Sequence, residues 1–265
     1  MLRDLKDLDY LMYRSIVSLY EKSYYDHAYL LYDLLYELDK IDLYVYIGEA
    51  SEIESYVLIW HGPGHIGVHI WRYREYFKQI IEKIILKRIR AIIQLYNSQD
   101  LEDITDLLKK LGAEFRVEAY LDMFVNEELF KPYNPQKATR LEPEHHAEQF
   151  IELKKIQGEE VSRESAKEIL RKQRCYGIFE ETRLVSIACR YIALPEIWII
   201  GNVFTHPEYR GRGYGKIVTS AITRDAVTSG ATAYLHVDKK NTAAINIYRE
   251  LGYVILRERP WIYVH

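Results

Sequence analysis

A stretch of glycines and basic residues, Arg210 to Lys216, constrains the fold of this chain more than any other part of its 265 residues. It reads Arg-Gly-Arg-Gly-Tyr-Gly-Lys and lies between an extended apolar run at 197–205 and an amphipathic run at 217–227. These runs predict a strand before the glycines and a helix after them. A helix that begins at a glycine-rich turn binds anions, because free backbone N–H groups and the positive end of the helix dipole meet there. The sequence therefore predicts an α/β segment with a phosphate site.

The spacing of the glycines excludes two common phosphate-binding motifs. Gly215-Lys216 is followed by Ile217, whereas a P-loop needs a Ser or Thr hydroxyl there to bind magnesium. A dinucleotide fingerprint needs Gly-x-Gly-x-x-Gly, and here the third glycine comes one residue early. The alternate glycines still let the backbone approach a ligand, and Arg210, Arg212 and Lys216 add positive charge.

The stretch matches Arg/Gln-x-x-Gly-x-Gly/Ala and resembles the coenzyme A pyrophosphate loop of the GNAT superfamily of acyl-CoA N-acyltransferases. Residues 203–207 are similar to the fourth strand of that family, residues 234–237 to its fifth strand, and residues 241–253 to the helix and turn that follow. The resemblance covers residues 137–265. It implies an α/β (α+β) fold with a mixed sheet flanked by helices, and acetyl-CoA as acyl donor without a metal.

The resemblance also implies roles for single residues. Backbone groups of the fourth strand would pair with pantetheine, and the loop would bind the pyrophosphate. Asn241 occupies the position of a side-chain contact to the cofactor, and Tyr248 that of the residue beside the thioester sulfur. Seven residues make almost two helical turns, so Asn241 and Tyr248 share one helix face about 10 Å apart. The implied cofactor-binding residues are Val203, Phe204, Thr205, Arg210, Gly211, Arg212, Gly213, Tyr214, Gly215, Lys216 and Asn241.

The activity implied is transfer of an acetyl or similar acyl group to a primary amine by direct attack in a ternary complex. Tyr248 is the predicted general acid, because a phenol with a pKa of about 10 can protonate a departing thiolate. A backbone N–H at Val203 or Thr205 is the predicted oxyanion donor. His236 is the predicted base, acting directly or through water. A water chain alone, Glu196 as base, and a surface histidine without a role remain alternatives.

A catalytically inactive module that binds acyl-CoA or a partner protein is the second hypothesis, since a fold alone does not establish turnover. Turnover that is lost on Tyr248→Phe would favour the enzyme. Tight binding without thiol release to any acceptor would favour the module. The sequence does not indicate the amine acceptor, which could be a small molecule, a protein N-terminus or a lysine. A homodimer is a hypothesis that the sequence leaves equally open.

The breaker Pro132-Tyr133-Asn134-Pro135 predicts a boundary between an α/β domain at 1–133, which starts with two helices, and a GNAT-like domain at 134–265. An offset of 140 residues aligns Leu111-Gly112 with Leu251-Gly252, each between a helix and a strand. We therefore hypothesise that residues 40–130 are a degenerate copy of the same fold without its cofactor site. Chance agreement of a common strand–helix–strand unit is the alternative. The extended segments expected there are 44–47, 56–60, 90–96 and 115–125, and the helices are 72–87 and 101–111.

Composition and charge bear on where the protein is located and which ligands it binds. Hydrophobic residues make up 48% of the chain, but no apolar run reaches the ~18 residues of a membrane span. The N-terminus is charged where a signal peptide is apolar, so we expect a cytoplasmic protein. Residues 1–136 carry a formal charge of −7 and residues 137–265 one of +4. That excess suits a small anionic ligand and is too weak for nucleic acid.

The cysteines and three clustered histidines predict no special chemistry. Cys175 and Cys189 are too few for a disulfide framework and lack metal-ligand spacing, so we expect reduced, buried thiols. His61, His65 and His69 recur every four residues, as metal ligands on a helix do. The Gly-Pro-Gly between the first two breaks a helix, so this segment predicts a hairpin.

Overall fold

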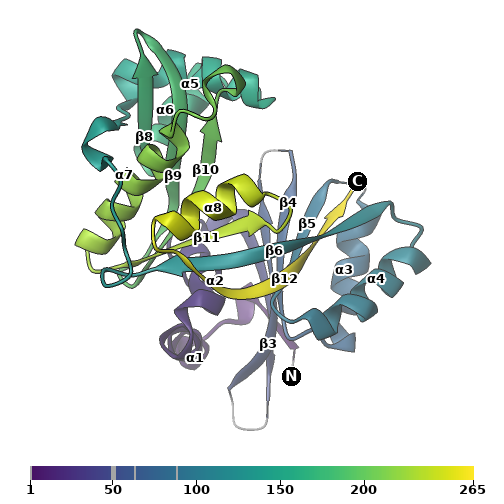
Figure 1. The fold of residues 1–265 in the computed structure, drawn as a ribbon. Helices are drawn as coiled ribbons and strands as arrows, with labels where there is room; N and C mark the ends of the chain where they lie inside the picture. Colours follow the sequence, from purple (N-terminus) through teal and green to yellow (C-terminus); the bar gives the residue numbers. More distant parts are fainter. Residues whose placement is uncertain (1, 49–51, 63, 88) are drawn as a thin grey trace. The chain divides into compact units, whose positions relative to one another are not determined.

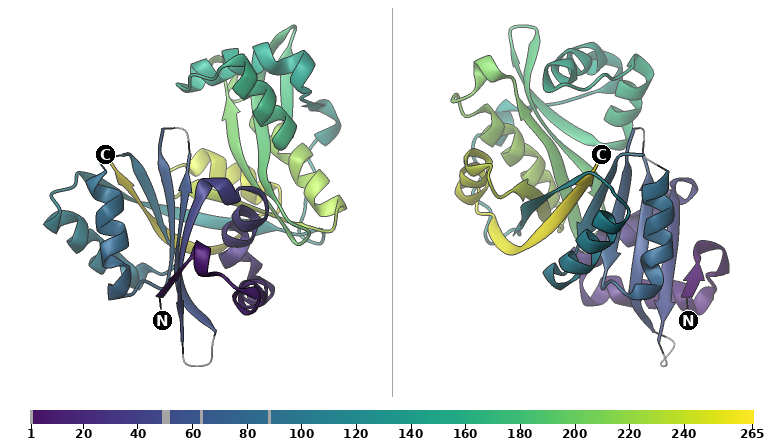
Figure 2. Two further views of the ribbon diagram at one scale, coloured as in Figure 1. Left: turned by 180° about the vertical axis from the view of Figure 1, so that it is seen from behind. Right: turned by 90° about the vertical axis from the view of Figure 1, so that its right-hand side faces the viewer.

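The structure is a computed structural model, and it describes residues 2–48, 52–62, 64–87 and 89–265. Strands and helices alternate in a mixed α/β arrangement (Figure 1), and helices cover both faces of the strands (Figure 2). This confirms the predicted fold class. No helix in the described ranges combines the length and the apolar character that crossing a membrane requires.

The chain contains the same series of elements twice. The first series, which we call the N-terminal copy, comprises β1 (Leu2–Asp4), α1 (Tyr10–Lys22), α2 (Tyr24–Tyr36), β2 (Ile41–Ile47), β3 (Ile53–His61), β4 (Ile66–Trp71), α3 (Lys78–Leu86), β5 (Ala91–Leu95), α4 (Leu101–Lys110) and β6 (Phe115–Val125). The second, the C-terminal copy, comprises β7 (Thr139–Arg140), α5 (Pro143–Gln157), α6 (Arg163–Lys172), β8 (Arg174–Glu180), β9 (Arg183–Ala193), β10 (Ile197–Thr205), α7 (Tyr214–Thr228), β11 (Thr232–Asp238), α8 (Thr242–Glu250) and β12 (Val254–Val264).

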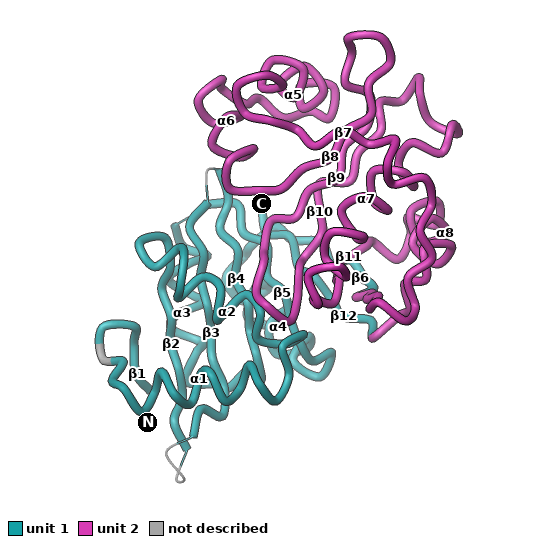
Figure 3. The backbone as a smooth tube through the Cα atoms, turned by 90° about the vertical axis from the view of Figure 1, so that its left-hand side faces the viewer, with its two compact units in different colours: residues 1–121, 257–265 teal, residues 122–256 magenta. Residues whose placement is uncertain are grey.

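The two compact units of the structure do not coincide with the two copies (Figure 3). The N-terminal unit comprises residues 1–121 and 257–265, and the C-terminal unit comprises residues 122–256. Each unit therefore contains part of the sixth strand of both copies. In the N-terminal unit β12 lies next to β5, whereas in the C-terminal unit β6 lies next to β11. The copies thus exchange their sixth strands.

In the N-terminal unit, helices cover both faces of the strands because side chains of a strand alternate between faces. On β3, Tyr56 and Leu58 belong to the core that α1 and α2 cover. Val57 and Ile59 belong to the opposite core, beneath α3 and α4. The exchanged strand β12 completes this second core through Ile262 and Val264, and it pairs antiparallel with β5.

In the C-terminal unit, Cys175 and Cys189 form a disulfide inside the core beneath α5 and α6. The prediction of reduced thiols is therefore wrong. The two residues lie directly opposite each other on the antiparallel strands β8 and β9, and both are fully buried. Their nearly equal distances from the turn at Glu181-Thr182 are the signal in the sequence that would have revealed the pairing.

The structure divides the chain at a different place from the predicted boundary at 133/134. The segment around that boundary lies inside the C-terminal unit. The Lys131 N–H donates to the Leu251 carbonyl at 3.0 Å, and the Tyr133 N–H donates to Ser220 Oγ at 2.8 Å. These hydrogen bonds hold the Pro-rich segment against α7 and the end of α8, and neither is visible in composition.

The other expected elements of the N-terminal half agree with the structure, with one difference. The hairpin predicted at the histidines is confirmed, since His61 of β3 pairs with Ile66 of β4. Pro63 lies outside the described residues. The helix expected at 72–87 begins only at Lys78, because Arg72 has a positive φ of 58° and a single turn at 75–77 precedes α3.

Candidate functional site

Strands β10 and β11 diverge in the C-terminal unit. They run parallel, and residues Ile197 to Ile200 pair with residues 232–235 of β11, where the ladder ends. β10 continues from Gly201 to Thr205 with half-buried residues, and Figure 1 shows the two strands pointing in different directions. Because a strand edge without a neighbouring strand presents backbone N–H and C=O groups, this segment can bind an extended ligand.

A β-bulge accompanies the divergence. The register between β10 and β9 shifts at Ile199/Ile200 and again between Gly201 and Phe204. Within this bulge, Asn202 has a positive φ of 53°. Its Oδ1 accepts a hydrogen bond from Nζ of the buried Lys154 at 2.8 Å. A bulge bends the strand that carries it, which gives a physical reason for β10 to leave the β11 ladder.

The glycine-rich loop follows β10 and leads into α7. Gly211 and Gly213 have φ values of 79° and 81°, a region that other residues rarely adopt. Gly213 is the N-cap of α7, and no described side chain caps this helix. The first N–H groups of a helix have no partner within the helix, so those of α7 are donors for an anion.

Two arginines bring positive charge to this loop. Arg210 donates from Nε to the Thr205 carbonyl at 3.2 Å, and the Arg212 guanidinium lies over the Tyr209 ring at 5.0 Å. Both arginines are exposed, and neither forms an ion pair with a carboxylate of the described residues. Their charges thus remain available to a phosphate.

Lys216 and Tyr214, also predicted to bind the cofactor, have protein partners. Lys216 Nζ lies 2.7 Å from Glu250 Oε2 and 4.1 Å from the centre of the Tyr133 ring. The Tyr214 hydroxyl donates to Glu180, and that hydrogen bond raises the pKa of the phenol. Lys216 would have to leave Glu250 in order to bind a phosphate directly.

Helix α8 approaches the loop at Ile247, the residue before Tyr248. A Cβ atom added to Gly215 would lie 3.3 Å from Thr205 Oγ1 and 3.7 Å from Ile247 Cδ1, so β10, α7 and α8 converge there. The neighbouring Tyr248 is only 6% exposed, and burial raises the pKa of its phenol. Asn241 is the N-cap of α8, and its Oδ1 accepts from the Ala244 N–H at 3.1 Å.

His236 directly follows the last paired residue of β11, at the start of the divergence. Its Nδ1 lies 2.6 Å from Oδ1 of Asp122 on β6, and their side chains are 4% and 0% exposed. The alternative of a surface histidine is therefore wrong. Glu196, the alternative base, directly precedes β10, at the end of the strand opposite to Thr205 and the glycine loop.

Sequence reasoning missed Asp122. The signal was present, because a carboxylate interrupts the apolar run from Leu121 to Val125 in a segment that already predicted a strand. Its partner could not be identified, because the exchange of β6 into the C-terminal unit is not visible in the sequence.

Comparisons with known proteins agree with this geometry. The model of the FR47-like protein family matches residues 175–262. A mycothiol acetyltransferase of Nocardiopsis dassonvillei is 34% identical over 58 residues, which are 22% of this chain and only 17% of that relative. A Drosophila protein of known structure matches with a TM-score of 0.74 at 14% identity, over 100% of this chain and 98% of its own.

Two further solved structures carry the family name. A GCN5-related N-acetyltransferase-like protein from Streptococcus suis has a TM-score of 0.64 at 14% identity, over 96% of this chain and 100% of its own. A tandem GNAT protein from the clavulanic acid biosynthesis pathway has a TM-score of 0.62 at 12% identity, over 100% of this chain and 98% of its own.

The likeness to these solved structures shows that the chain has the GNAT fold twice in tandem. The hypothesis of a second copy of the GNAT fold in the N-terminal half is thereby confirmed.

The N-terminal GNAT copy differs from its partner copy where the diverging strands and the glycine loop would be. Its strands β4 and β5 pair from Ile66 to Ile70, one residue short of the end of β4 at Trp71. Residues 72–77, which lead into α3, contain no glycine. The features that expose a strand edge and form a phosphate loop in the C-terminal GNAT copy thus have no counterpart among the described residues of β4, β5 and α3.

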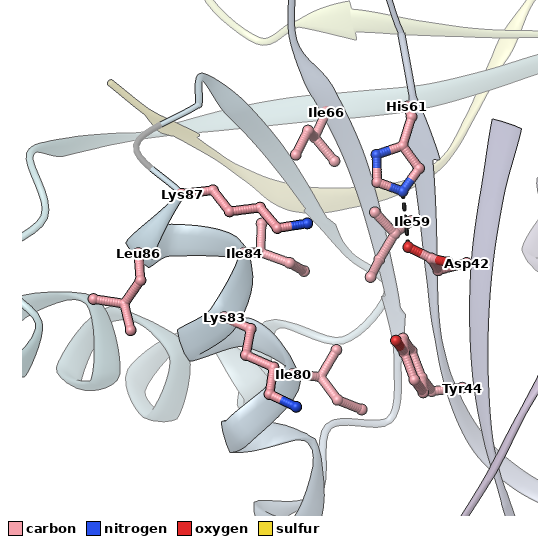
Figure 4. Close-up of a pocket in the computed structure, with 10 residues that line it drawn as sticks. All are labelled: Asp42, Tyr44, Ile59, His61, Ile66, Ile80, Lys83, Ile84, Leu86 and Lys87. Atoms are coloured by element: carbon pink, nitrogen blue, oxygen red, sulfur yellow. Dashed lines mark hydrogen bonds and ion pairs between the residues drawn. The ribbon is translucent and has the colours of Figure 1, made fainter.

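The N-terminal unit has a pocket of its own. An open cavity of about 420 Å³ lies between α3 and strands β2, β3 and β4 (Figure 4). Helix α3 lines one side of it and has 9 residues, against 15 in α7. Lys83 and Lys87 line it, together with the hydrogen-bonded side chains of His61 and Asp42, 2.8 Å apart. None of the predicted site residues lines this pocket.

The three clustered histidines have separate partners. His61 bonds to Asp42, whereas the His69 ring nitrogen Nδ1 lies 3.2 Å from the Tyr96 hydroxyl. The His65 ring lies 5.8 Å from that of Trp60. Across the described ranges, no group of three or more His, Cys, Asp or Glu side chains is arranged to hold a metal ion.

Proposed function

We propose that this protein is an acyl-CoA-dependent N-acyltransferase, which transfers an acetyl or similar acyl group from coenzyme A to a primary amine. One observation carries the proposal. The edge of β10 from Gly201 to Thr205 leads directly into a glycine loop and an uncapped helix N-terminus. This combination fits an elongated ligand that has amide groups at one end and phosphates at the other.

The proposed cofactor site follows the direction of the chain. Backbone groups of Val203, Phe204 and Thr205 bind the pantetheine arm through hydrogen bonds of the strand type. The pyrophosphate occupies the loop from Arg210 to Lys216, where the α7 N–H groups and the arginine charges converge. Asn241 contacts the cofactor arm from α8. Neither arginine has a carboxylate partner within the part of the chain that the structure describes, which supports this assignment.

Acetyl-CoA, when bound, supplies the acyl group as a thioester. His236 accepts the proton that the attacking amine loses as its nitrogen bonds to the acyl carbon. The backbone N–H of Val203 or Thr205 donates to the carbonyl oxygen, where negative charge develops. As the carbon–sulfur bond breaks, Tyr248 gives its phenolic proton to the sulfur. Solvent then returns the proton from His236 to Tyr248.

The burial of Tyr248 sets its protonation state. Burial raises the pKa of the phenol, so Tyr248 carries its proton at neutral pH. Because a thiolate is a weaker base than this phenolate, Tyr248 gives up the proton only as the carbon–sulfur bond breaks, and it regains a proton at once from solvent. A surface tyrosine would be exposed to competing water.

The test is thiol release from acetyl-CoA with a panel of primary amines, comparing wild type with Tyr248→Phe. We expect kcat to fall about 100-fold, because a general acid contributes on that order. Tyr176→Phe is the matched control, since this buried tyrosine of the same unit bonds to Asp225 instead. Acetyl-CoA binding without thiol release to any amine would favour the inactive binding module.

A further inference from the structure

Asp122 is a buried carboxylate in an apolar strand. It is 0% exposed, and its neighbours Leu121 and Met123 are 7% and 0% exposed. Removing a charge from water costs several kcal/mol, which a partner offsets only in good geometry. An apolar residue would stabilise this strand at least as well, so the position calls for an explanation other than packing.

The partner of Asp122 is the proposed base. Its Oδ1 accepts from Nδ1 of His236 at 2.6 Å. A neutral imidazole carries one proton, so a hydrogen on Nδ1 puts the ring's lone pair on Nε2. When Nε2 then gains a proton, the ring becomes a cation beside a carboxylate that stabilises it. The pair thus fixes both the tautomer and the orientation of His236.

The strand exchange brings these residues together. His236 belongs to the C-terminal copy, whereas Asp122 lies on β6, the sixth strand of the N-terminal copy, which lies next to β11. Both side chains are in the C-terminal unit. The proposed active site therefore depends on a residue from the copy that lacks the glycine loop.

The other exchanged strand, β12, contributes a different group in the N-terminal unit. The offset of 140 residues aligns His236 with Tyr96, which directly follows β5. There β12 contributes Arg259, which is 1% exposed, donates to the Tyr96 hydroxyl and lies 4.6 Å from its ring. Burial raises the Tyr96 pKa to about 12. A phenol and a guanidinium thus replace the imidazole and the carboxylate, and they do not form a base.

We propose that Asp122, contributed by the N-terminal copy, is a positioning residue that holds His236 as the Nδ1–H tautomer with Nε2 directed to the acceptor amine. This inference rests on the proposed function, since His236 serves as a base only if acyl transfer occurs. It also gives the N-terminal copy a reason to be retained without a cofactor site of its own.

The test compares the full chain with Asp122→Asn. Two-bond ¹⁵N–¹H spectra of the labelled histidines report the tautomer of His236, assigned by its loss in His236→Gln. In wild type His236 should be the Nδ1–H tautomer. In Asp122→Asn the tautomer of His236 should change. We expect kcat to fall 10- to 100-fold, as when partners that orient a histidine are removed. The Kd for acetyl-CoA should stay within about twofold.

Three controls make the result decisive. Asp225→Asn removes another carboxylate of the C-terminal unit, bonded to Arg174 and Tyr176, and should leave kcat and the His236 tautomer unchanged. Asp122→Glu keeps a carboxylate and should retain the Nδ1–H tautomer with partial activity, and it replaces Asp122→Asn if that variant does not fold. The double variant with His236→Gln should be no slower than His236→Gln alone.

Two results would overturn the proposal. One is a His236 tautomer that is the same in Asp122→Asn as in wild type. The other is that Asp122→Asn lowers kcat by the same factor in the His236→Gln variant as in wild type. If wild type binds acetyl-CoA but never acylates an amine, the proposed function fails instead, and the tautomer spectra still decide whether Asp122 positions His236.

Discussion

At the residue scale, both proposed catalytic side chains are buried. Tyr248 and His236 both lie in the interior of the C-terminal unit, and His236 directly follows the point where β10 and β11 separate. The motif located both residues in the sequence. Their environments came only from the fold, because the raised pKa of Tyr248 and the carboxylate beside His236 depend on segments far away in the chain.

Asp33 gives a prediction for stability against pH. It is 5% exposed on α2, and burial, with a smaller contribution from the nearby Glu37, raises its pKa from 3.8 to about 7. The folded state therefore keeps a proton that the unfolded chain releases, so this residue makes folding less favourable as pH rises from about 4 to 7.

Asp33→Asn should remove that penalty. We expect its Tm to exceed that of wild type at pH 8, by roughly 2–4 °C for each kcal/mol relieved, and to match wild type near pH 4. Differential scanning calorimetry at the two pH values measures this. Asp39→Asn, at an exposed site just after α2, is the control. An equal gain at both pH values would show that the effect is not ionisation.

At the element scale, the local rules of the sequence were sufficient for most helices and strands but not for their pairing. The glycine loop predicted the strand before it and the helix after it, and both are present as β10 and α7. The bulge at Asn202 and the disulfide between β8 and β9 escaped prediction, because each depends on the register of two strands. Register follows from contacts across the sheet, which a single segment does not encode.

The disulfide leads to a prediction for the C-terminal unit. Cys175→Ser with Cys189→Ser should lower stability by about 2–3 kcal/mol, because the crosslink closes a loop of 14 residues in the unfolded chain. Calorimetry of the double variant measures the loss. Alkylation of wild type unfolded without reductant, followed by mass spectrometry, checks the pairing. Two alkylated cysteines would contradict it.

At the scale of the whole molecule, the repeat was predictable and the strand exchange was not. The two copies share an order of elements, and the matching Leu-Gly pairs at Gly112 and Gly252 revealed it in the sequence. The sixth strands at 115–125 and 254–264 are both suitable neighbours for either fifth strand by pattern alone. Only the three-dimensional structure shows that β12 pairs with β5 and that β6 lies beside β11.

The differences between the copies predict one cofactor site per chain. The C-terminal copy has the diverging strands and the glycine loop, whereas β4 stays paired with β5 almost to its end and no glycine precedes α3. Any acyl-CoA should therefore bind at the loop before α7.

Isothermal titration calorimetry of the full chain with acetyl-CoA tests this most directly. Gly213→Asp places a negative side chain at a position with φ of 81°, so it should weaken binding tenfold or more, about 1.4 kcal/mol. Gly230→Asp is the matched control, since Gly230 has a φ of 84° beyond the other end of the same helix, with open space around it. We predict one molecule bound per chain, lost in Gly213→Asp and retained in Gly230→Asp. Absence of binding to folded wild type, or equal binding by both variants, would contradict the account.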